Sequence, residues 1–153
     1  SDEDWHDAIL KYEREQFYEN TYLKNIRPDA NIKLTLVGQY NTLLDHINVH
    51  RWYLGERYKR PVGWDEAVLS WYRKVYLPTV RIIRNRNIMQ DFPGRTEGDL
   101  YLWIIQHQYY LAQHDGRDVP IEQAARHFVD KYSTNLGKRL RYMLHKVRKF
   151  FKK

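Results

Sequence analysis

Apolar residues recur along most of this chain at intervals of three and four positions, the spacing that places side chains on one face of an α-helix. One such stripe lies in the middle of the chain and consists of Leu43, Ile47, His50 and Leu54. A second stripe with the same spacing consists of Leu100, Ile104, His107 and Leu111. The periodic segments alternate with connections rich in Pro and Gly, so the sequence predicts an all-α protein.

The two stripes belong to longer segments that match each other. His50 falls on His107 when the sequence is moved along itself by 57 positions, the distance between residues 50 and 107. Further identities follow without a gap, namely Arg60 with Arg117, Val62 with Val119, Ala67 with Ala124 and Lys74 with Lys131. A repeated helix–loop–helix unit explains these matches, because they fall on apolar and turn positions together. We therefore expect a pseudo-symmetric helical domain, with two duplicated helical hairpins at about 32–86 and 88–135 between N- and C-terminal helices.

The first helix is expected from about Asp4 to Asn20 and is amphipathic. Its stripe consists of Trp5, Ile9, Tyr12 and Gln16, and Ala8 and Phe17 widen it. Beyond this helix, residues 32–36 alternate between apolar and polar side chains as a β-strand does. A single strand of this length would lack a partner in the chain, so we expect an extended loop that packs on the helices.

Local signals indicate several helix ends. Thr96 and Asp99 have the spacing of an N-terminal capping box. Gly116 can adopt the left-handed conformation that ends a helix, and Pro120 suits the first turn of the next helix. Pro78 lies inside a helical pattern and must bend or restart that helix, because proline cannot donate the main-chain hydrogen bond.

The two ends of the chain carry opposite charge, although the net charge of the whole chain is +7. Residues 1–20 contain seven acids and two bases, a charge of −5. Residues 137–153 contain eight bases and no acid, a charge of +8. This asymmetry indicates either an acid–base contact within the molecule or a basic end that binds an anionic partner.

The basic end is predicted to form an amphipathic helix over residues 135–151. Its apolar stripe consists of Leu136, Leu140, Met143, Val147, Phe150 and Phe151. Together with residues 119–128 it is similar in pattern to a helix-turn-helix, although Val129 and Asp130 stand where the turn glycine would fall. The alternative is a solvated charged face above a stripe packed on the core. If this helix binds nucleic acid, the expected contacts are Lys138, Arg139, Arg141, His145, Lys146, Arg148 and Lys149.

Two histidines occupy equivalent positions in the repeats, His50 and His107. His46 precedes His50 by one helical turn, so His46, His50 and His107 are the candidate ligands of a metal or small-molecule site. The second repeat has Trp103 in place of His46, which breaks the pattern. The preferred interpretation is therefore a pair of buried, hydrogen-bonded histidines with neither a metal nor a cofactor.

Two arginines also recur, just before the second helix of each repeat. Arg60 and Arg117 are candidate anion contacts near a helix N-terminus. The preferred interpretation is an ion pair with a carboxylate of the same repeat, such as Asp65 or Glu122.

Composition narrows the class of protein further. A chain of 153 residues fits a single helical domain, 1–153. The chain has no cysteine, which excludes disulfides and Cys-ligated metals and fits a cytoplasmic protein. No apolar run is long enough to span a membrane, and the acidic start is unlike a signal peptide. Motifs of dinucleotide-binding proteins, phosphate loops, serine hydrolases and zinc proteases do not occur, so nothing strongly supports an enzyme.

One segment of the chain resembles a motif of an uncharacterised bacterial domain. The segment consists of His50-Arg-Trp-Tyr-Leu-Gly-Glu56, followed by Val62 and Asp65-Glu-Ala-Val68. That domain follows a lipopolysaccharide-kinase-like region in actinobacterial proteins. The resemblance recurs more weakly at residues 107–132. It implies a helical accessory module of bacterial origin and assigns no catalytic residue.

These observations lead to one functional hypothesis and two alternatives. The leading hypothesis is a non-enzymatic binding module that contacts nucleic acid through its basic C-terminal helix. The first alternative is a structural interaction domain of a larger bacterial protein, whose tail binds other domains of the same polypeptide or a protein partner. The second alternative is a metal or small-ligand site at the paired histidines.

Overall fold

The structure, a computed structural model, describes residues 1–133 and 136–151, and for residues 136–142 it describes the main chain alone. Its helices are α1 (Asp2–Thr21), α2 (Leu23–Ile26), α3 (Gln39–Tyr58), α4 (Trp64–Trp71), α5 (Leu77–Asn85), α6 (Glu97–Asp115), α7 (Ile121–Tyr132) and α8 (Leu136–Phe151). A π-helical turn, Tyr72–Tyr76, joins α4 to α5, and a 3-10 turn, Ile88–Asp91, follows α5. Within these described ranges there is no strand, so the all-α prediction is confirmed.

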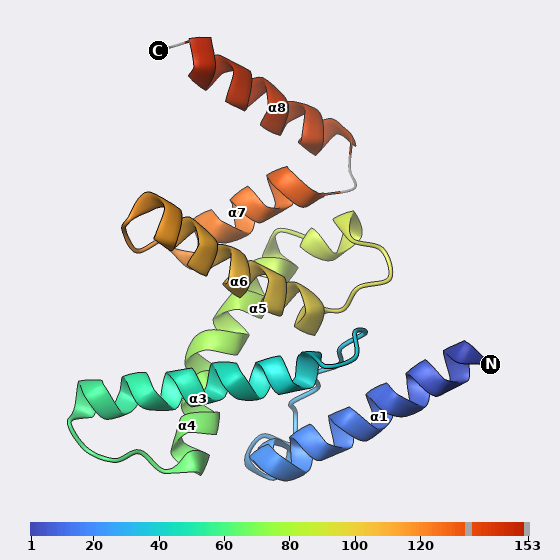
Figure 1. Cartoon of the computed structure of the whole chain (residues 1–153), viewed down its shortest axis with the longest axis vertical. Helices are drawn as coiled ribbons and strands as arrows, with labels where there is room; N and C mark the ends of the chain where they lie inside the picture. Colours follow the sequence, from blue (N-terminus) through green and yellow to red (C-terminus); the bar gives the residue numbers. More distant parts are fainter. Residues whose placement is uncertain (134–135, 152–153) are drawn as a thin grey trace.

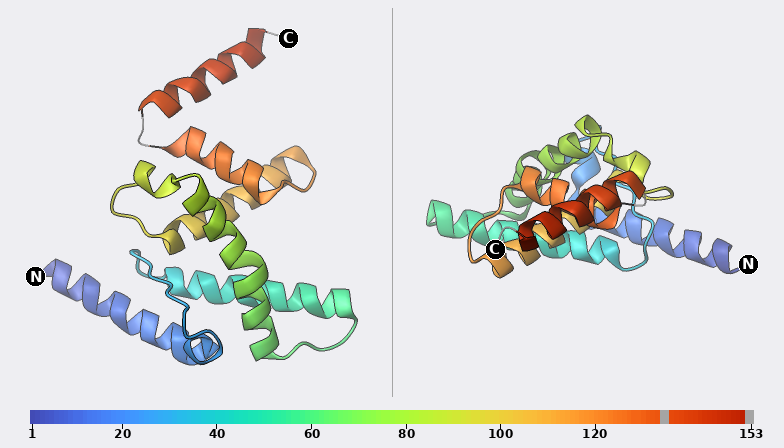
Figure 2. Two further views of the ribbon diagram at one scale, coloured as in Figure 1. Left: turned by 180° about the vertical axis from the view of Figure 1, so that it is seen from behind. Right: turned by 90° about the horizontal axis from the view of Figure 1, so that it is seen from above.

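One long helical rod, made of α4, the π turn and α5, runs along the molecule and connects its two halves (Figure 1). Helices α1, α2 and α3 pack on its first half, and the α6–α7 hairpin packs on its second half. Helix α8 lies beyond α7 at one end of the molecule, far from α1 at the other end (Figure 2). Within one chain, α1 and α8 therefore do not form the acid–base contact that their charges would allow.

The π turn explains how the rod passes Pro78 without a break. Pro78 is the second residue of α5, which begins directly after the π turn. A proline inside a helix removes one main-chain hydrogen bond, and its ring crowds the preceding turn. The wider π turn, in which the N–H of Leu77 donates to the carbonyl of Tyr72, leaves room for the ring. The expected bend or restart at Pro78 thus takes the form of a local widening of a continuous helix.

The buried core follows the rod. In the first half, Trp71 is completely buried and its indole N–H donates a hydrogen bond to the hydroxyl of Tyr101 on α6, at 2.9 Å. In the second half, Phe92 and Phe128 stack with ring centroids 5.4 Å apart. Burial of several aromatic rings stabilises both halves, and the Trp71–Tyr101 contact ties the halves together.

The segment before α3 is an extended loop, as expected. Ile32 and Leu34 are buried, and their main-chain N–H groups donate to the hydroxyls of Tyr18 and Tyr40, at 2.8 and 3.1 Å. Side chains therefore satisfy the hydrogen bonds that a neighbouring strand would otherwise provide. The loop lies so close to α6 that a Cβ on Gly98 would come within 2.9 Å of a main-chain carbonyl oxygen.

The predicted helix ends agree closely with the structure. Thr96 and Asp99 form the expected reciprocal capping box at the start of α6. Gly116 ends α6 in the left-handed conformation, with φ of 66°. Pro120 is the residue immediately before α7, one position earlier than expected.

Apolar stripes on amphipathic helices are usually buried. Most of the α1 stripe and the described part of the α8 stripe instead face solvent. On α1, Trp5, Ile9 and Tyr12 are exposed, and of the expected stripe the helix buries Phe17, at its edge. On α8, the described apolar side chains are all exposed, namely Met143, Leu144, Val147, Phe150 and Phe151. The alternative in which the α8 stripe packs on the core is therefore wrong for these residues.

Candidate functional site

A basic groove of about 500 Å³ lies between α7 and α8, and we call it the α7–α8 groove. Its lining residues are Gln123, Arg126, His127, Asp130, His145, Lys146 and Lys149. The groove follows from the amphipathic pattern of α7, because Ala124, Ala125, Phe128 and Val129 face the core. The remaining face of α7, with Arg126 and Asp130 one turn apart, therefore turns toward α8.

The basic side chains of α8 divide into three groups with respect to this groove. His145, Lys146 and Lys149, three of the candidate nucleic-acid contacts, line it. Arg148 is exposed on α8 outside the groove lining. The side chains of the other three predicted contacts, Lys138, Arg139 and Arg141, lie outside the described residues.

Arg126 and His127 belong to the groove although the sequence analysis did not single them out. Both lie on α7, where the only sequence signal is their position opposite the buried alanines. Their position predicts a contact with an anion only once the basic helix α8 is known to lie next to this face of α7.

One histidine of the groove lining, His127, pairs with His107 of α6, which lies outside this lining. His107 Nε2 and His127 Nδ1 are 2.7 Å apart, and the two rings are stacked with centroids 4.9 Å apart. Burial lowers the pKa of His107 to about 4, and the neighbouring His127 and Lys131 contribute to the same shift. Burial likewise lowers the pKa of His127. Both rings are therefore neutral at neutral pH, with one N–H donating to the other nitrogen.

An aromatic pocket of about 390 Å³ lies on the other side of this pair. Tyr110 and Tyr132 line it beside His107 and Phe128, and both tyrosines are exposed. The ammonium of Lys131 lies 5.6 Å from the ring centre of Tyr110 and 5.3 Å from that of Tyr132. Flat rings next to cationic side chains can stack with bases or other planar groups.

His46 and His50 lie in a different place from His107. They line a cavity of about 190 Å³ against α4 and α6, whereas His107 lines the aromatic pocket. His46 Nδ1 is 3.1 Å from the hydroxyl of Tyr101, and His50 Nε2 is 2.8 Å from that of Ser70. Burial lowers the pKa of both histidines. The hypothetical three-histidine site is therefore not assembled, and the described residues contain no group of three potential metal-ligating side chains.

The two candidate anion contacts Arg60 and Arg117 differ in their surroundings. Arg60 forms a bidentate ion pair with Glu66, rather than with Asp65, and the shorter contact is 2.7 Å. The guanidinium of Arg60 lowers the pKa of Glu66. Arg117 is exposed, and the carboxylate proposed as its partner, Glu122, pairs with another arginine.

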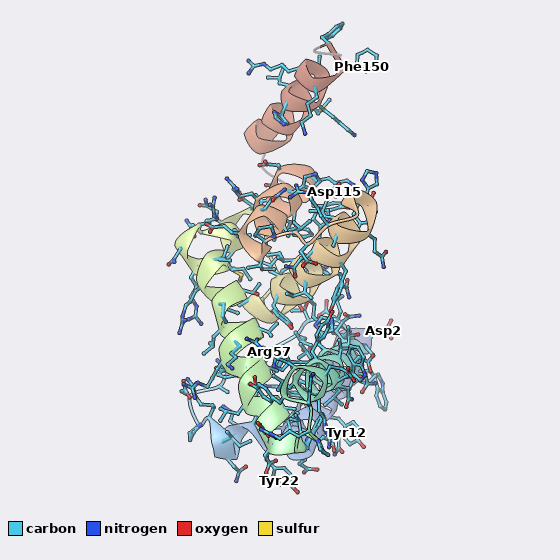
Figure 3. The ribbon with its side chains drawn as sticks, turned by 90° about the vertical axis from the view of Figure 1, so that its left-hand side faces the viewer. Asp2, Tyr12, Tyr22, Arg57, Asp115 and Phe150 are labelled. Atoms are coloured by element: carbon cyan, nitrogen blue, oxygen red, sulfur yellow. The ribbon has the colours of Figure 1, made fainter. Side chains whose placement is uncertain are left out.

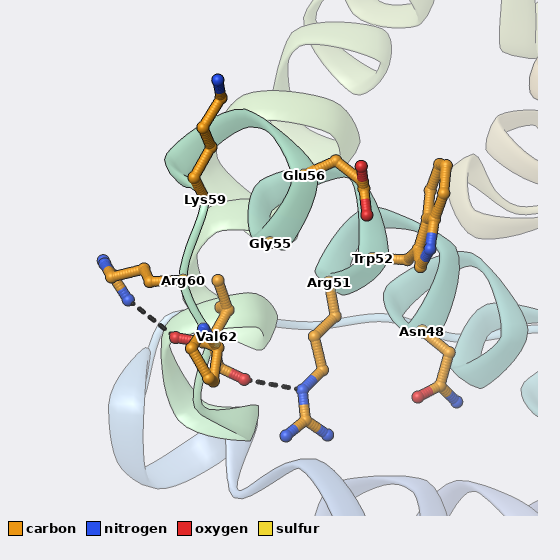
Figure 4. A pocket seen from close by; sticks show the side chains of 9 residues that line it. Asn48, Arg51, Trp52, Gly55, Glu56, Lys59, Arg60 and Val62 are labelled. Atoms are coloured by element: carbon orange, nitrogen blue, oxygen red, sulfur yellow. Dashed lines mark hydrogen bonds between the residues drawn. The ribbon is translucent and has the colours of Figure 1, made fainter.

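A pocket of about 810 Å³ lies next to Arg60, at the end of α3 (Figure 4). Arg51 reaches across its floor and donates to the main-chain carbonyl of Val62, at 2.8 Å. Trp52 and Glu56 line the same pocket. Both arginines of this pocket therefore have protein partners.

Figure 3 shows the side chains along the whole molecule, with α8 set apart beyond the hairpin that carries Asp115. In the part of the chain that the structure describes, no helix is both long and apolar enough to cross a membrane.

Comparison with protein families gives one match. A family described as a domain of unknown function (DUF4032) matches residues 69–133, from the end of α4 through α7. This match confirms the resemblance to an uncharacterised domain, and it includes the segment 107–132 in which the resemblance recurs. Comparisons with curated proteins and with solved structures yield no match.

Proposed function

We propose that this protein is a non-enzymatic binding module whose α7–α8 groove holds the phosphates of nucleic acid. The observation that carries the proposal is the convergence of Arg126, Lys146 and Lys149 from two helices on one groove. Asp130 is the one acidic residue of the groove lining. Phosphate binding is dominated by such clustered cations, because each neutralised phosphate releases counterions.

The charge of the surrounding helix supports the same proposal. Residues 137–153 carry eight bases and no acid, so the groove opens next to a strongly positive segment. The order of α7, a short connection and a basic α8 is that of a helix-turn-helix, although α8 is set apart from the body. A turn of standard geometry is not required, since phosphate contacts need cationic side chains rather than one fold.

The aromatic pocket favours a single strand over a duplex. Tyr110 and Tyr132 present exposed rings close to the groove, and the linked His107–His127 pair lies between the two sites. Unpaired nucleobases can stack on such rings while their phosphates contact the cationic side chains of the groove, whereas the nucleobases of a duplex are already stacked. We therefore expect tighter binding of single-stranded DNA or RNA than of a duplex of the same length.

The test is a binding titration with labelled single strands and duplexes of random sequence at about 50 and 200 mM salt, the range over which phosphate contacts weaken. The variant K146A/K149A removes two groove cations. Its matched control is R73A/R81A, which removes two exposed cations from the central rod and leaves the same net charge.

We expect K146A/K149A to bind more weakly to every sequence and to reduce the salt dependence by about two counterions, one for each phosphate that is no longer neutralised. The control should bind like the unmodified protein. Absence of binding at the lower salt concentration, or an equal reduction of affinity in the two variants, would contradict the proposal.

We also infer that the two helical hairpins arose by duplication. An offset of 57 positions places α3 on residues 96–115, close to the bounds of α6. The same offset relates the contact of His50 with Ser70 to the contact of His107 with His127.

A second pair of hydrogen bonds supports the duplication. Arg51 donates to the carbonyl of Val62, and Gln108, 57 positions later, donates to the carbonyl of Val119, both at 2.8 Å. In each hairpin the hydrogen bond ties the first helix to the loop that precedes the second helix. Equivalent hydrogen bonds made by different residue types indicate a common architecture rather than a coincidence of composition.

A further inference from the structure

Helix α1 exposes an apolar stripe that no other described part of the chain covers. Trp5 is 73% exposed and Tyr12 is 63% exposed, and Ile9 lies between them on the same face. Ile9 and Tyr12 also line a groove of about 410 Å³ between α1 and α3, which Leu44 of α3 closes on the far side. An exposed apolar stripe beside a groove is typical of an interaction surface.

The charge around this stripe is negative. Residues 1–20 carry −5, and the acidic Glu13 lies in the groove itself. A helix that binds here should therefore combine an apolar stripe with basic flanks.

Helix α8 has these properties. The side chains of Phe150 and Phe151 are 77% and 79% exposed, and Val147 lies one turn before Phe151 on the same face. The segment 137–153 carries +8. The α8 side chains that line the α7–α8 groove are His145 and Lys146 with Lys149, so the apolar stripe points away from that groove.

The two surfaces cannot meet within one molecule, because α1 and α8 lie at opposite ends (Figures 1 and 2). We propose that this protein assembles head to tail, with the apolar stripe of α8 in one copy seated in the α1–α3 groove of the next copy. The partner is therefore a second copy of the chain. The interface is heterologous, so it leaves one free α1 and one free α8 at the ends of each assembly and allows further copies to add.

This inference does not rest on nucleic-acid binding, because it uses the opposite face of α8. It is tested on protein freed of nucleic acid, by sedimentation velocity over about 1 µM to 1 mM, the range of weak to moderate affinities. We expect the unmodified protein to form species that grow with concentration. We also expect high salt to weaken them, since opposite charges flank the interface.

Two complementary variants make the test specific for a head-to-tail interface. The variant W5Q/Y12Q makes the stripe of α1 polar and leaves the stripe of α8 unchanged. The variant V147Q/F150Q makes the stripe of α8 polar and leaves the stripe of α1 unchanged. All four positions are exposed, so the substitutions should leave the fold intact. Each variant alone should be monomeric, and an equimolar mixture should form a dimer and stop there, because only one productive interface remains.

The matched control is W52Q/Y53Q, which replaces two similarly exposed aromatic residues of α3 and should assemble like the unmodified protein. A monomeric unmodified protein, a mixture that stays monomeric, or single variants that still assemble would overturn the proposal. A membrane is the competing occupant of the α8 stripe, because basic amphipathic helices also bind anionic lipids. Flotation of monomeric protein with vesicles of phosphatidylcholine and phosphatidylserine, abolished by V147Q/F150Q, would overturn the proposal as well.

Discussion

His107 shows how one buried side chain makes stability depend on pH. The ring is buried, and its pKa is lowered to about 4 from an ordinary value of 6.5. Between these two values the unfolded chain binds a proton that the folded chain does not bind. Folding therefore becomes less favourable as the pH falls from about 7 toward 4, and the contribution of His107 is fully present only above its unfolded pKa.

We predict that replacing His107 by Gln reduces this pH dependence. Glutamine stays neutral and can still donate a hydrogen bond to His127, so the variant lacks one of the buried groups that resist protonation. The decrease in the free energy of unfolding between pH 7.5 and pH 4.5 should be smaller than in the unmodified protein by about 1–3 kcal/mol. Urea denaturation at both pH values measures it, with the exposed His114→Gln as the control. Equal pH dependence in H107Q and the unmodified protein would show that His107 does not resist protonation in the fold.

At the scale of the helical elements, the ends of α3 and α6 offer a test of the duplication. Both helices end in a left-handed residue, Lys59 with φ of 54° and Gly116 with φ of 66°, at positions 57 residues apart. Only glycine adopts this conformation without a steric cost from Cβ, so Lys59 carries strain that Gly116 avoids.

We predict opposite effects of two substitutions at these caps. Lys59→Gly should raise the free energy of unfolding and Gly116→Ala should lower it, each by about 1 kcal/mol. Thermal and urea unfolding measure both changes. If the two substitutions shifted stability in the same direction, the two caps would not be equivalent.

The same elements show which parts of the structure the sequence could predict. The stripes containing Leu43 and Leu100 are buried as their spacing suggests, because α3 and α6 each pack on the rod. The exception is His50, which is half-buried, whereas His107 is buried as expected. The stripe containing Trp5 has equally regular spacing but is exposed, because α1 buries the face that carries Phe17. Periodicity identifies an apolar face, but the face that becomes buried depends on which elements lie beside it.

The sequence predicts the α8 side of the candidate site but not its α7 side. The basic character of α8 follows directly from its composition, and His145, Lys146 and Lys149 were expected to contact anions. The participation of Arg126 and His127 depends on how α8 lies over α7, which no local pattern encodes. The separation of His107 from His46 and His50 has the same origin, because the two hairpins face different neighbours.

At the scale of the whole molecule, the described side chains of α8, residues 143–151, are not part of the core. All described side chains from Met143 to Phe151 are exposed, and those facing α7 are polar. Helix α1 differs, because it contributes the buried Phe17 and Thr21 to the first half of the core.

We therefore predict that a chain ending at Tyr142, which lacks the exposed side chains of residues 143–151, folds with nearly unchanged stability. Its free energy of unfolding should stay within about 1 kcal/mol of the unmodified value, because removal of exposed side chains creates no cavity. A chain that begins at Tyr22 should instead lose cooperative unfolding, because Phe17 leaves a cavity in the core. Circular dichroism during thermal and urea unfolding distinguishes the two truncations. A large decrease in stability on removal of residues 143–153 would mean that the described side chains of α8 pack on the core in solution, and its apolar stripe would then not be available to a second copy.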